Sequence, residues 1–134
     1  QEAEITARAK ELLKVVHLSG KEDLEADNLP YGEQRRLEIA RALATDMKLL
    51  LLDEPFSSLD PSTKKRLYAE IENIPQKFDC AVLFVTHDFR EAQMLASRIG
   101  IMSNGRMLCI RSAEELFVRS SNTELNSFLG LEDA

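Results

Sequence analysis

Four consecutive leucines, Leu49 to Leu52, run directly into Asp53-Glu54-Pro55. A short, uniformly apolar run that is closed by a turn residue is typical of a strand buried on both faces in a parallel sheet. Ligands of such sheets collect at the carboxyl ends of the strands, so Asp53 and Glu54 are expected where a nucleotide or a metal ion binds. Two adjacent acids suit two tasks, holding Mg²⁺ and orienting an attacking water. These seven residues alone leave open a strand end that merely carries solvated acids.

The rest of the chain alternates between helical and strand patterns. A second apolar run, Cys80 to Val85, ends at Thr86-His87, so His87 is expected close to Asp53 and Glu54. Asn104-Gly105 is the strongest short signal for a hairpin. We therefore predict an α/β fold with parallel core strands, flanking helices and a C-terminal β-hairpin. The predicted helices run from the start of the chain to about 17 and over 32–45, 62–73, 89–97 and 113–118, and the predicted hairpin strands are 99–102 and 106–110.

The amino-acid composition of the chain argues against several classes of function. The chain has 134 residues, of which 44% are apolar and 30% are charged, as expected for one soluble globular domain or less. Its net charge of −6 argues against a nucleic-acid platform, because phosphate backbones attract clustered Lys and Arg. No apolar stretch approaches the roughly 20 residues of a membrane-spanning helix, and Cys80 and Cys109 lack a metal-binding spacing. We expect a cytoplasmic protein that binds no nucleic acid.

Residues 29–43 read LPYGEQRRLEIARAL. This stretch resembles the signature segment of ATP-binding cassette (ABC) transporter ATPases, an LSGGQ pentapeptide that leads into a helix ending in ARAL. Leu49 to Pro55 resembles the Walker B strand, Ser57-Ser58-Leu59-Asp60 the D-loop, and Thr86-His87-Asp88 the switch histidine. The motifs occur in the order and at the spacing of the family, and the resemblance covers essentially the whole chain.

Two motifs of the family have no counterpart in this sequence. The phosphate-binding loop, GxxxxGK followed by Ser or Thr, is absent, and so is the Q-loop. The resemblance therefore implies the C-terminal portion of one nucleotide-binding domain, a partial P-loop NTPase fold over residues 1–134. Residues 1–45 would form part of the helical subdomain with the signature helix, and residues 46–134 part of the catalytic core. Without the phosphate-binding loop, the isolated chain is expected to be inactive as an ATPase.

The resemblance also implies roles for residues near the strand ends. Glu54 would be the catalytic carboxylate, Asp53 would hold Mg²⁺, and His87 would bind the γ-phosphate of ATP and position the attacking water. Taken alone, His87 could instead be satisfied by local backbone groups. Asp60 would reach across a dimer interface toward the nucleotide of the partner, although a carboxylate directly before Pro61 is also a typical helix cap.

The signature segment departs from the common pattern. Where the family has Ser-Gly-Gly-Gln, this chain has Pro30-Tyr31-Gly32-Glu33. A glycine at a helix N-terminus permits close approach to a phosphate, and Gly32 meets that requirement. Pro30 removes a hydroxyl group and Glu33 brings a negative charge near an anion, so the ATP contact of Tyr31, Gly32 and Glu33 is expected to be weaker or different. An ordinary turn before a helix is the alternative.

The function that the resemblance implies is an ATPase that uses ATP and Mg²⁺ as a head-to-tail homodimer. It would be a peripheral subunit at the cytoplasmic face of the membrane, bound to the permease subunits of an importer. Residues 122–130 resemble the ends of ATPases of molybdate and tungstate importers, whereas Pro30-Tyr31-Gly32 resembles branched-chain amino-acid importers, so the substrate stays open. Two other classes remain, a soluble ABC ATPase outside transport and a non-catalytic interaction module.

Overall fold

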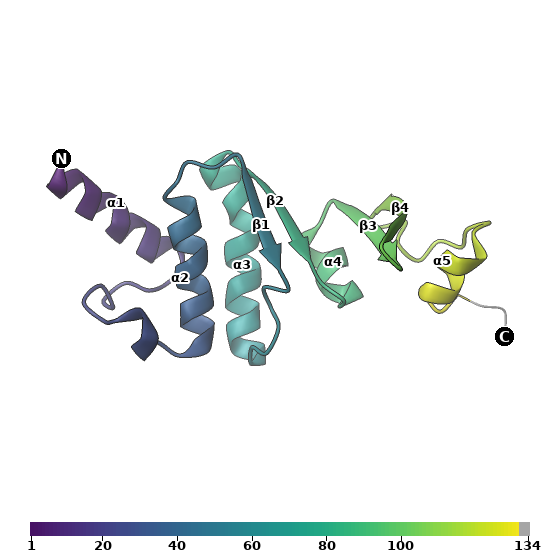
Figure 1. Ribbon diagram of the computed structural model, residues 1–134, viewed down its shortest axis with the longest axis horizontal. Helices are drawn as coiled ribbons and strands as arrows, with labels where there is room; N and C mark the ends of the chain where they lie inside the picture. Colours follow the sequence, from purple (N-terminus) through teal and green to yellow (C-terminus); the bar gives the residue numbers. More distant parts are fainter. Residues whose placement is uncertain (132–134) are drawn as a thin grey trace. The chain divides into compact units, whose positions relative to one another are not determined.

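Helices and strands alternate in this computed structural model, which describes residues 1–131 (Figure 1). They form two compact units, residues 1–87 and the residues from Asp88 onward. No helix among residues 1–131 is long and apolar enough to cross a membrane. In chain order the elements are α1 (Glu2–Val15), the 3₁₀ turn η1 (Ala26–Asn28), α2 (Tyr31–Leu43), β1 (Leu49–Asp53), α3 (Pro61–Phe78), β2 (Ala81–Val85), α4 (Phe89–Leu95), β3 (Arg98–Ser103), β4 (Arg106–Ser112) and α5 (Thr123–Phe128).

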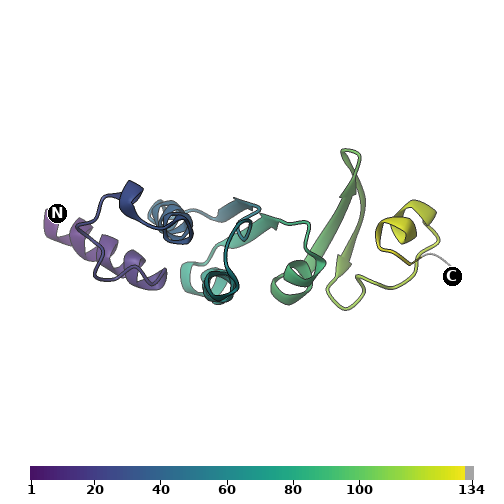
Figure 2. The ribbon, with the colours of Figure 1, turned by 90° about the horizontal axis from the view of Figure 1, so that it is seen from below.

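The two apolar runs form a parallel pair of strands, as predicted. Leu49 of β1 pairs with Ala81 of β2, and Asp53 pairs with Val85, so both strands end at the same edge. The chain passes from one strand to the other through α3, because parallel neighbours need a long crossover connection. Figure 2 shows α2 and α3 end-on beside these strands. The α/β class and the parallel core strands are confirmed.

Only one face of this strand pair is covered. Leu50 is buried, whereas Leu49 and Leu51 are 57% and 64% exposed. Leu83 and Val85 of β2 are also exposed. Side chains alternate between the two faces of a strand, and no element of residues 1–87 covers the second set. The prediction of a strand buried on both faces is therefore wrong for the described residues, because the leucine run does not specify what lies on each face.

The core of the first unit lies among the three helices and the covered strand face. The ring of Phe56 packs edge-on against Tyr68 of α3, at 4.7 Å between centroids, and against Phe84 of β2, at 5.9 Å. These contacts fix the loop after β1 between the strand pair and α3. The buried apolar side chains of the unit are Leu12, Val16, Leu18, Leu29, Ile39, Ala40, Leu43, Leu50, Phe56, Leu67, Ile71, Ile74 and Cys80.

Helix α3 is longer than the sequence predicts. The expected end was Asn73, but the helix continues to Phe78, contains Pro75 and ends at Asp79, which adopts the left-handed conformation with φ 48°. A proline inside a helix removes one backbone hydrogen bond and costs roughly 3 kcal/mol. Ile74 is almost completely buried, and the packing of this side chain holds the last turns of the helix in place.

The second unit is built on the predicted hairpin. β3 and β4 pair antiparallel, and both turn residues have positive φ, 48° at Asn104 and 75° at Gly105. A type I′ turn requires this conformation at both positions. The hairpin prediction is therefore confirmed. Its buried side chains, together with those of the following segment, form a cluster of Ile99, Ile101, Leu116, Leu125 and Leu129.

Residues 113–117 form turns and Val118 has no regular structure, so the helix predicted over 113–118 is wrong. Ser112 and Glu115 do form a capping box, in which the Glu115 N–H donates to Ser112 Oγ at 3.3 Å and the Ser112 N–H donates to Glu115 Oε2 at 3.5 Å. The Arg111 guanidinium then donates to the carbonyls of Glu115 and Leu116, each at 3.2 Å, and to that of Val118. These bonds occupy carbonyl groups that a continuing helix would use. The helix forms later, as α5, where a tail was expected.

Candidate functional site

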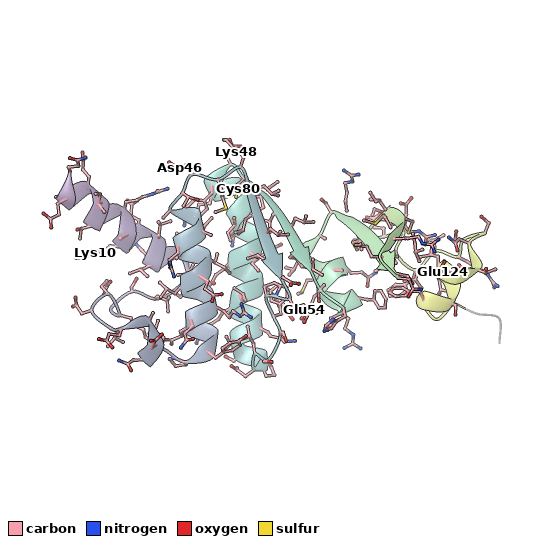
Figure 3. The ribbon with its side chains drawn as sticks, viewed as in Figure 1. Lys10, Asp46, Lys48, Glu54, Cys80 and Glu124 are labelled. Atoms are coloured by element: carbon pink, nitrogen blue, oxygen red, sulfur yellow. The ribbon has the colours of Figure 1, made fainter. Side chains whose placement is uncertain are left out.

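The carboxyl ends of β1 and β2 carry three of the predicted site residues. Asp53 is the last residue of β1, Glu54 follows it, and His87 lies two residues beyond β2. The Glu54 N–H donates to the carbonyl of Val85 at 2.9 Å, which extends the strand pairing by one bond. Figure 3 shows Glu54 at this edge and Lys48 at the opposite one. The sheet thus brings the three residues to one edge, as the sequence predicts.

Glu54 and His87 are in direct contact. His87 Nδ1 lies 3.1 Å from Glu54 Oε1, and the two side chains are 80% and 42% exposed. Glu54 has a φ of 43°, a left-handed conformation that costs a non-glycine residue about 1–2 kcal/mol. A neutral imidazole with its proton on Nδ1 donates to the carboxylate and leaves Nε2 for a second partner. Both groups can therefore meet a ligand that arrives from solvent.

Asp53 is exposed beside a cleft of about 240 Å³ between α2 and β1, which Arg35 and Glu38 also line. Among residues 1–131, no three His, Cys, Asp or Glu side chains gather to hold a metal ion. Mg²⁺ is usually bound through one or two carboxylates, and waters and substrate phosphates supply its other ligands. A single exposed carboxylate at a strand end suits that arrangement. Asp53 therefore fits a Mg²⁺ site that a phosphate substrate completes.

The first turn of α2 presents backbone N–H groups. The carbonyl of Pro30, the residue before the helix, accepts from the N–H groups of Glu33 at 2.8 Å and Gln34 at 3.0 Å. No side chain caps this end of the helix, and the N–H groups of Tyr31 and Gly32 have no acceptor within it. Unpaired N–H groups and the helix dipole both favour an anion at this position.

Gly32 allows α2 to approach α3 closely. A Cβ atom at this position would lie 2.6 Å from Thr63 Cγ2 and 3.5 Å from Leu59 Cδ2. The first distance is far shorter than a van der Waals contact between carbon atoms. Close approach of a phosphate is one reason for a glycine at this helix N-terminus. Packing within the chain gives a second, independent reason for a glycine at this position.

Neighbouring cations hold the two residues that flank Gly32. The Glu33 carboxylate pairs with Lys21 and lies 3.8 Å from Arg36 Nη2. Its charge is thus compensated within the chain, which weakens the expected repulsion between Glu33 and an anionic ligand. Tyr31 Oη accepts from Arg35 Nε at 3.0 Å, and the Arg35 guanidinium lies 5.3 Å from the centroid of the Tyr31 ring.

Asp60 caps the N-terminus of α3. Asp60 Oδ1 accepts from the N–H groups of Ser62 and Thr63, both at 3.0 Å, and Oδ2 accepts from the Thr63 hydroxyl. Hydrogen bonds to the charged form, above all that of the Thr63 hydroxyl, lower the pKa of the Asp60 carboxyl from its usual value. The helix-cap interpretation is confirmed. A reach of Asp60 across a dimer interface stays a prediction.

The sequence patterns did not predict a buried ion pair between α2 and α3. Arg36 and Glu70 are 3% and 5% exposed, and Arg36 Nη1 lies 3.7 Å from Glu70 Oε1. His17 Nε2 lies 4.0 Å from the same oxygen. Burial raises the pKa of Glu70 to about 7, although Arg36 acts in the opposite direction. A signal was available, because Arg36 lies three residues before Ile39 and Glu70 three residues after Leu67, on the apolar stripes of their helices.

Known proteins resemble this chain along most of its length. Residues 1–57 match the protein family described as ABC transporter. The chain is 41% identical over 125 residues to a probable sulfate/thiosulfate import ATP-binding protein of Chlorella vulgaris. This match covers 93% of the chain and 53% of that relative. The chain is also 40% identical over 131 residues to a molybdate/tungstate import ATP-binding protein of Thermococcus kodakarensis. This match covers 98% of the chain and 40% of that relative. The chain therefore spans about half the length of the first relative, and less of the second.

Two solved structures have a similar backbone. An ATP-binding cassette of an ABC transporter in its ADP conformation has a TM-score of 0.79 and 21% identity, and the match covers 96% of this chain and 51% of that one. An inward-facing, putative metal-chelate type ABC transporter has a TM-score of 0.78 and 22% identity, and the match covers 92% of this chain and 48% of that one. At these identities the likeness shows the fold alone.

Proposed function

Because the chain belongs to the ABC transporter ATPase family, we propose that it is part of an ATP-hydrolysing subunit that drives import through a membrane permease. The relatives named above are import ATP-binding proteins. The observation that carries the proposal is the 3.1 Å contact between His87 Nδ1 and Glu54 Oε1, directly after Asp53 at the carboxyl edge of two parallel strands. Nucleotides bind at that edge in open α/β sheets.

Glu54 is proposed to orient the attacking water and to accept its proton. Phosphoryl transfer asks a protein mainly to position groups and to stabilise charge, so the placement of this carboxylate matters more than its basicity. The Glu54 N–H is bonded to the Val85 carbonyl at 2.9 Å and its carboxylate contacts His87, so two partners position it. A doubly protonated His87 can donate from Nδ1 to Glu54 and from Nε2 to a γ-phosphate oxygen.

Asp53 is proposed to hold Mg²⁺, which when bound neutralises charge on the phosphates. We expect Asp53→Asn to raise the Mg²⁺ concentration that gives half-maximal hydrolysis by about tenfold or more in the complete subunit, because an amide keeps the shape but loses the charge. A Mg²⁺ titration of ATP hydrolysis measures this shift. Glu38→Gln, which removes a carboxylate from the other wall of the cleft beside Asp53, serves as the control. An unchanged Mg²⁺ dependence in Asp53→Asn would refute the role.

We propose a second copy of the subunit as the partner of the α2 N-terminus. In a head-to-tail homodimer, Tyr31, Gly32 and Glu33 would lie against the ATP held by the other subunit. The support is the set of unpaired N–H groups of the first turn, together with the compensated charge of Glu33. Asp60 would lie at the same interface. Permease subunits are the second proposed partner, and with them the protein would act at the cytoplasmic face of the membrane.

For the transported substrate we propose an oxyanion. Support comes from the tail that resembles those of molybdate and tungstate importers and from the relatives named for sulfate/thiosulfate and molybdate/tungstate import. Other relatives are named for Fe(3+) ions and for carnitine. The branched-chain amino-acid alternative rests on Pro30-Tyr31-Gly32 alone.

ATP hydrolysis by the 134-residue chain, beside a version extended upstream to the start codon, tests the proposed function. We expect activity only in the extended protein, and stimulation of that activity by its permease in vesicles. An extended protein that still lacks a phosphate-binding loop and hydrolyses nothing would favour the non-catalytic interaction module. Robust hydrolysis by a protein that binds no permease would favour a soluble ABC ATPase outside transport.

A further inference from the structure

We propose that Thr63 is a positioning residue that couples the N-terminus of α2 to the carboxylate of Asp60. Thr63 lies in the first turn of α3, is half-buried and contacts both segments, one through its methyl group and one through its hydroxyl group. Only the catalytic consequence of this coupling rests on the proposed function. The coupling itself is a property of residues within the first unit.

The methyl group of Thr63 fills the space that Gly32 leaves open. A Cβ on Gly32 would lie 2.6 Å from Thr63 Cγ2, a distance that real Cβ contacts essentially never show. The same Cβ would lie 3.5 Å from Leu59 Cδ2. Residues on both sides of Asp60 in the chain thus pack against Gly32. A shift of the α2 N-terminus toward α3 must therefore displace Thr63, because well-packed contacts leave little free volume.

The polar groups of Thr63 hold both oxygens of Asp60. The Thr63 N–H donates to Asp60 Oδ1 at 3.0 Å, and the Thr63 hydroxyl donates to Oδ2. The Ser62 N–H also donates to Oδ1 at 3.0 Å. Oδ1 therefore has two backbone donors, whereas the donor of Oδ2 is a side chain that can rotate. The orientation of the Asp60 carboxylate then depends on the Thr63 rotamer, which contact with Gly32 restricts.

Substitutions can separate the two contacts of Thr63. Thr63→Val keeps a branched side chain of the same shape and removes the donor to Asp60 Oδ2. Thr63→Ser keeps a hydroxyl donor and removes the methyl group that faces Gly32. Gly32→Ala introduces the clash with that methyl group. The double variant Gly32→Ala/Thr63→Ser adds a methyl group at position 32 and removes the Thr63 methyl group that it would meet. This variant should therefore restore the packing between the two positions.

The pKa of Asp60 in the complete subunit, measured by carbon-13 NMR titration, reads the coupling without reference to activity. We expect Thr63→Val to raise this pKa and Thr63→Ser to leave it nearly unchanged. Gly32→Ala should also raise it, and Thr63→Ser should reverse most of that rise in the double variant. The proposal is overturned if Gly32→Ala leaves the pKa of Asp60 unchanged, or if Thr63→Ser does not reverse the rise. If Gly32→Ala fails to fold, equal pKa values in Thr63→Val and Thr63→Ser overturn it.

The rate of ATP hydrolysis measures the catalytic consequence of the coupling between Gly32 and Asp60. Gly32→Ala is expected to lower kcat by about tenfold or more, because misplacement by about 1 Å can cost about a hundredfold. Thr63→Ser is expected to recover several-fold of that loss. Recovery by Thr63→Ser would show that the loss arises at the contact between Gly32 and Thr63. A parallel recovery of the Asp60 pKa in the same variant separates the coupling from restored packing alone. If the unsubstituted subunit hydrolyses no ATP, the proposed function fails, while the Asp60 titration still decides the coupling.

Discussion

In the complete subunit, Glu54→Gln is expected to lower ATP turnover by about a hundredfold or more while ATP binding is retained, since a positioned general base typically contributes 10²–10⁴. The glutamine side chain has nearly the same shape, so the loop after β1 should keep its fold. It loses the negative charge that orients the water and accepts its proton. Single-turnover hydrolysis and nucleotide-binding titrations on the same preparation separate the two effects.

A matched control distinguishes a catalytic carboxylate from a general loss of charge. Glu72 of α3 is exposed and lies outside the strand edge, so Glu72→Gln should hydrolyse ATP at close to the unsubstituted rate. Because Glu54 and His87 are in contact, the losses from Glu54→Gln and His87→Ala should not add in the double variant. Hydrolysis by Glu54→Gln near the unsubstituted rate would remove Glu54 from the mechanism.

Local chemistry predicted those parts of the fold that depend on neighbours in the sequence. Asn104-Gly105 specified its hairpin because both residues tolerate positive φ. Asn122 carries a similar local signal, since its Oδ1 accepts from the Leu125 N–H at 3.2 Å and begins α5. The short helix was nevertheless missed, because a cap before six residues gives a weak periodic pattern. Residues 113–117 form turns in place of the predicted helix, because Arg111 bonds to carbonyl groups that a helix would use, and no helical pattern reports these bonds.

The strand-end residues of the site could be predicted, whereas the contacts that hold them could not. Parallel strands bring their carboxyl ends together, so the proximity of Glu54 and His87 follows from the positions of two apolar runs. Glu70 is 34 positions from Arg36, and their pairing depends on how two helices face each other. The contact between Gly32 and Thr63 depends on the same packing. Charged residues on apolar stripes indicate that a buried partner exists, but not which residue it is.

Arg36→Met is expected to lower the free energy of unfolding by about 3–5 kcal/mol at pH 8, which is typical when one partner of a buried pair is removed. Arg36 Nη1 donates to the Val16 carbonyl at 3.0 Å and lies 3.7 Å from Glu70 Oε1. The methionine fills similar space but leaves the Glu70 carboxylate buried without this cation. Arg8→Met is the control, because exposed Arg8 pairs with Glu11 and Asp46 only at 3.8 and 3.7 Å, and such pairs contribute about 0–1 kcal/mol.

The loss in Arg36→Met should depend on pH. Burial raises the pKa of Glu70 from 4.5 to about 7, so the folded protein binds this proton more tightly than the unfolded chain. The stability that Glu70 contributes is therefore complete below about pH 4.5 and is lost as the pH rises through about 7. His17 and Arg66 also act on this carboxyl, but removal of Arg36 should raise its pKa further, so the loss should continue to higher pH. Urea unfolding at pH 5 and pH 8 should show the larger effect of Arg36→Met on the free energy of unfolding at pH 8. Adding Glu70→Gln to the same chain should abolish the difference between the two pH values. Equal losses of stability at both pH values would show that Glu70 does not titrate in this range.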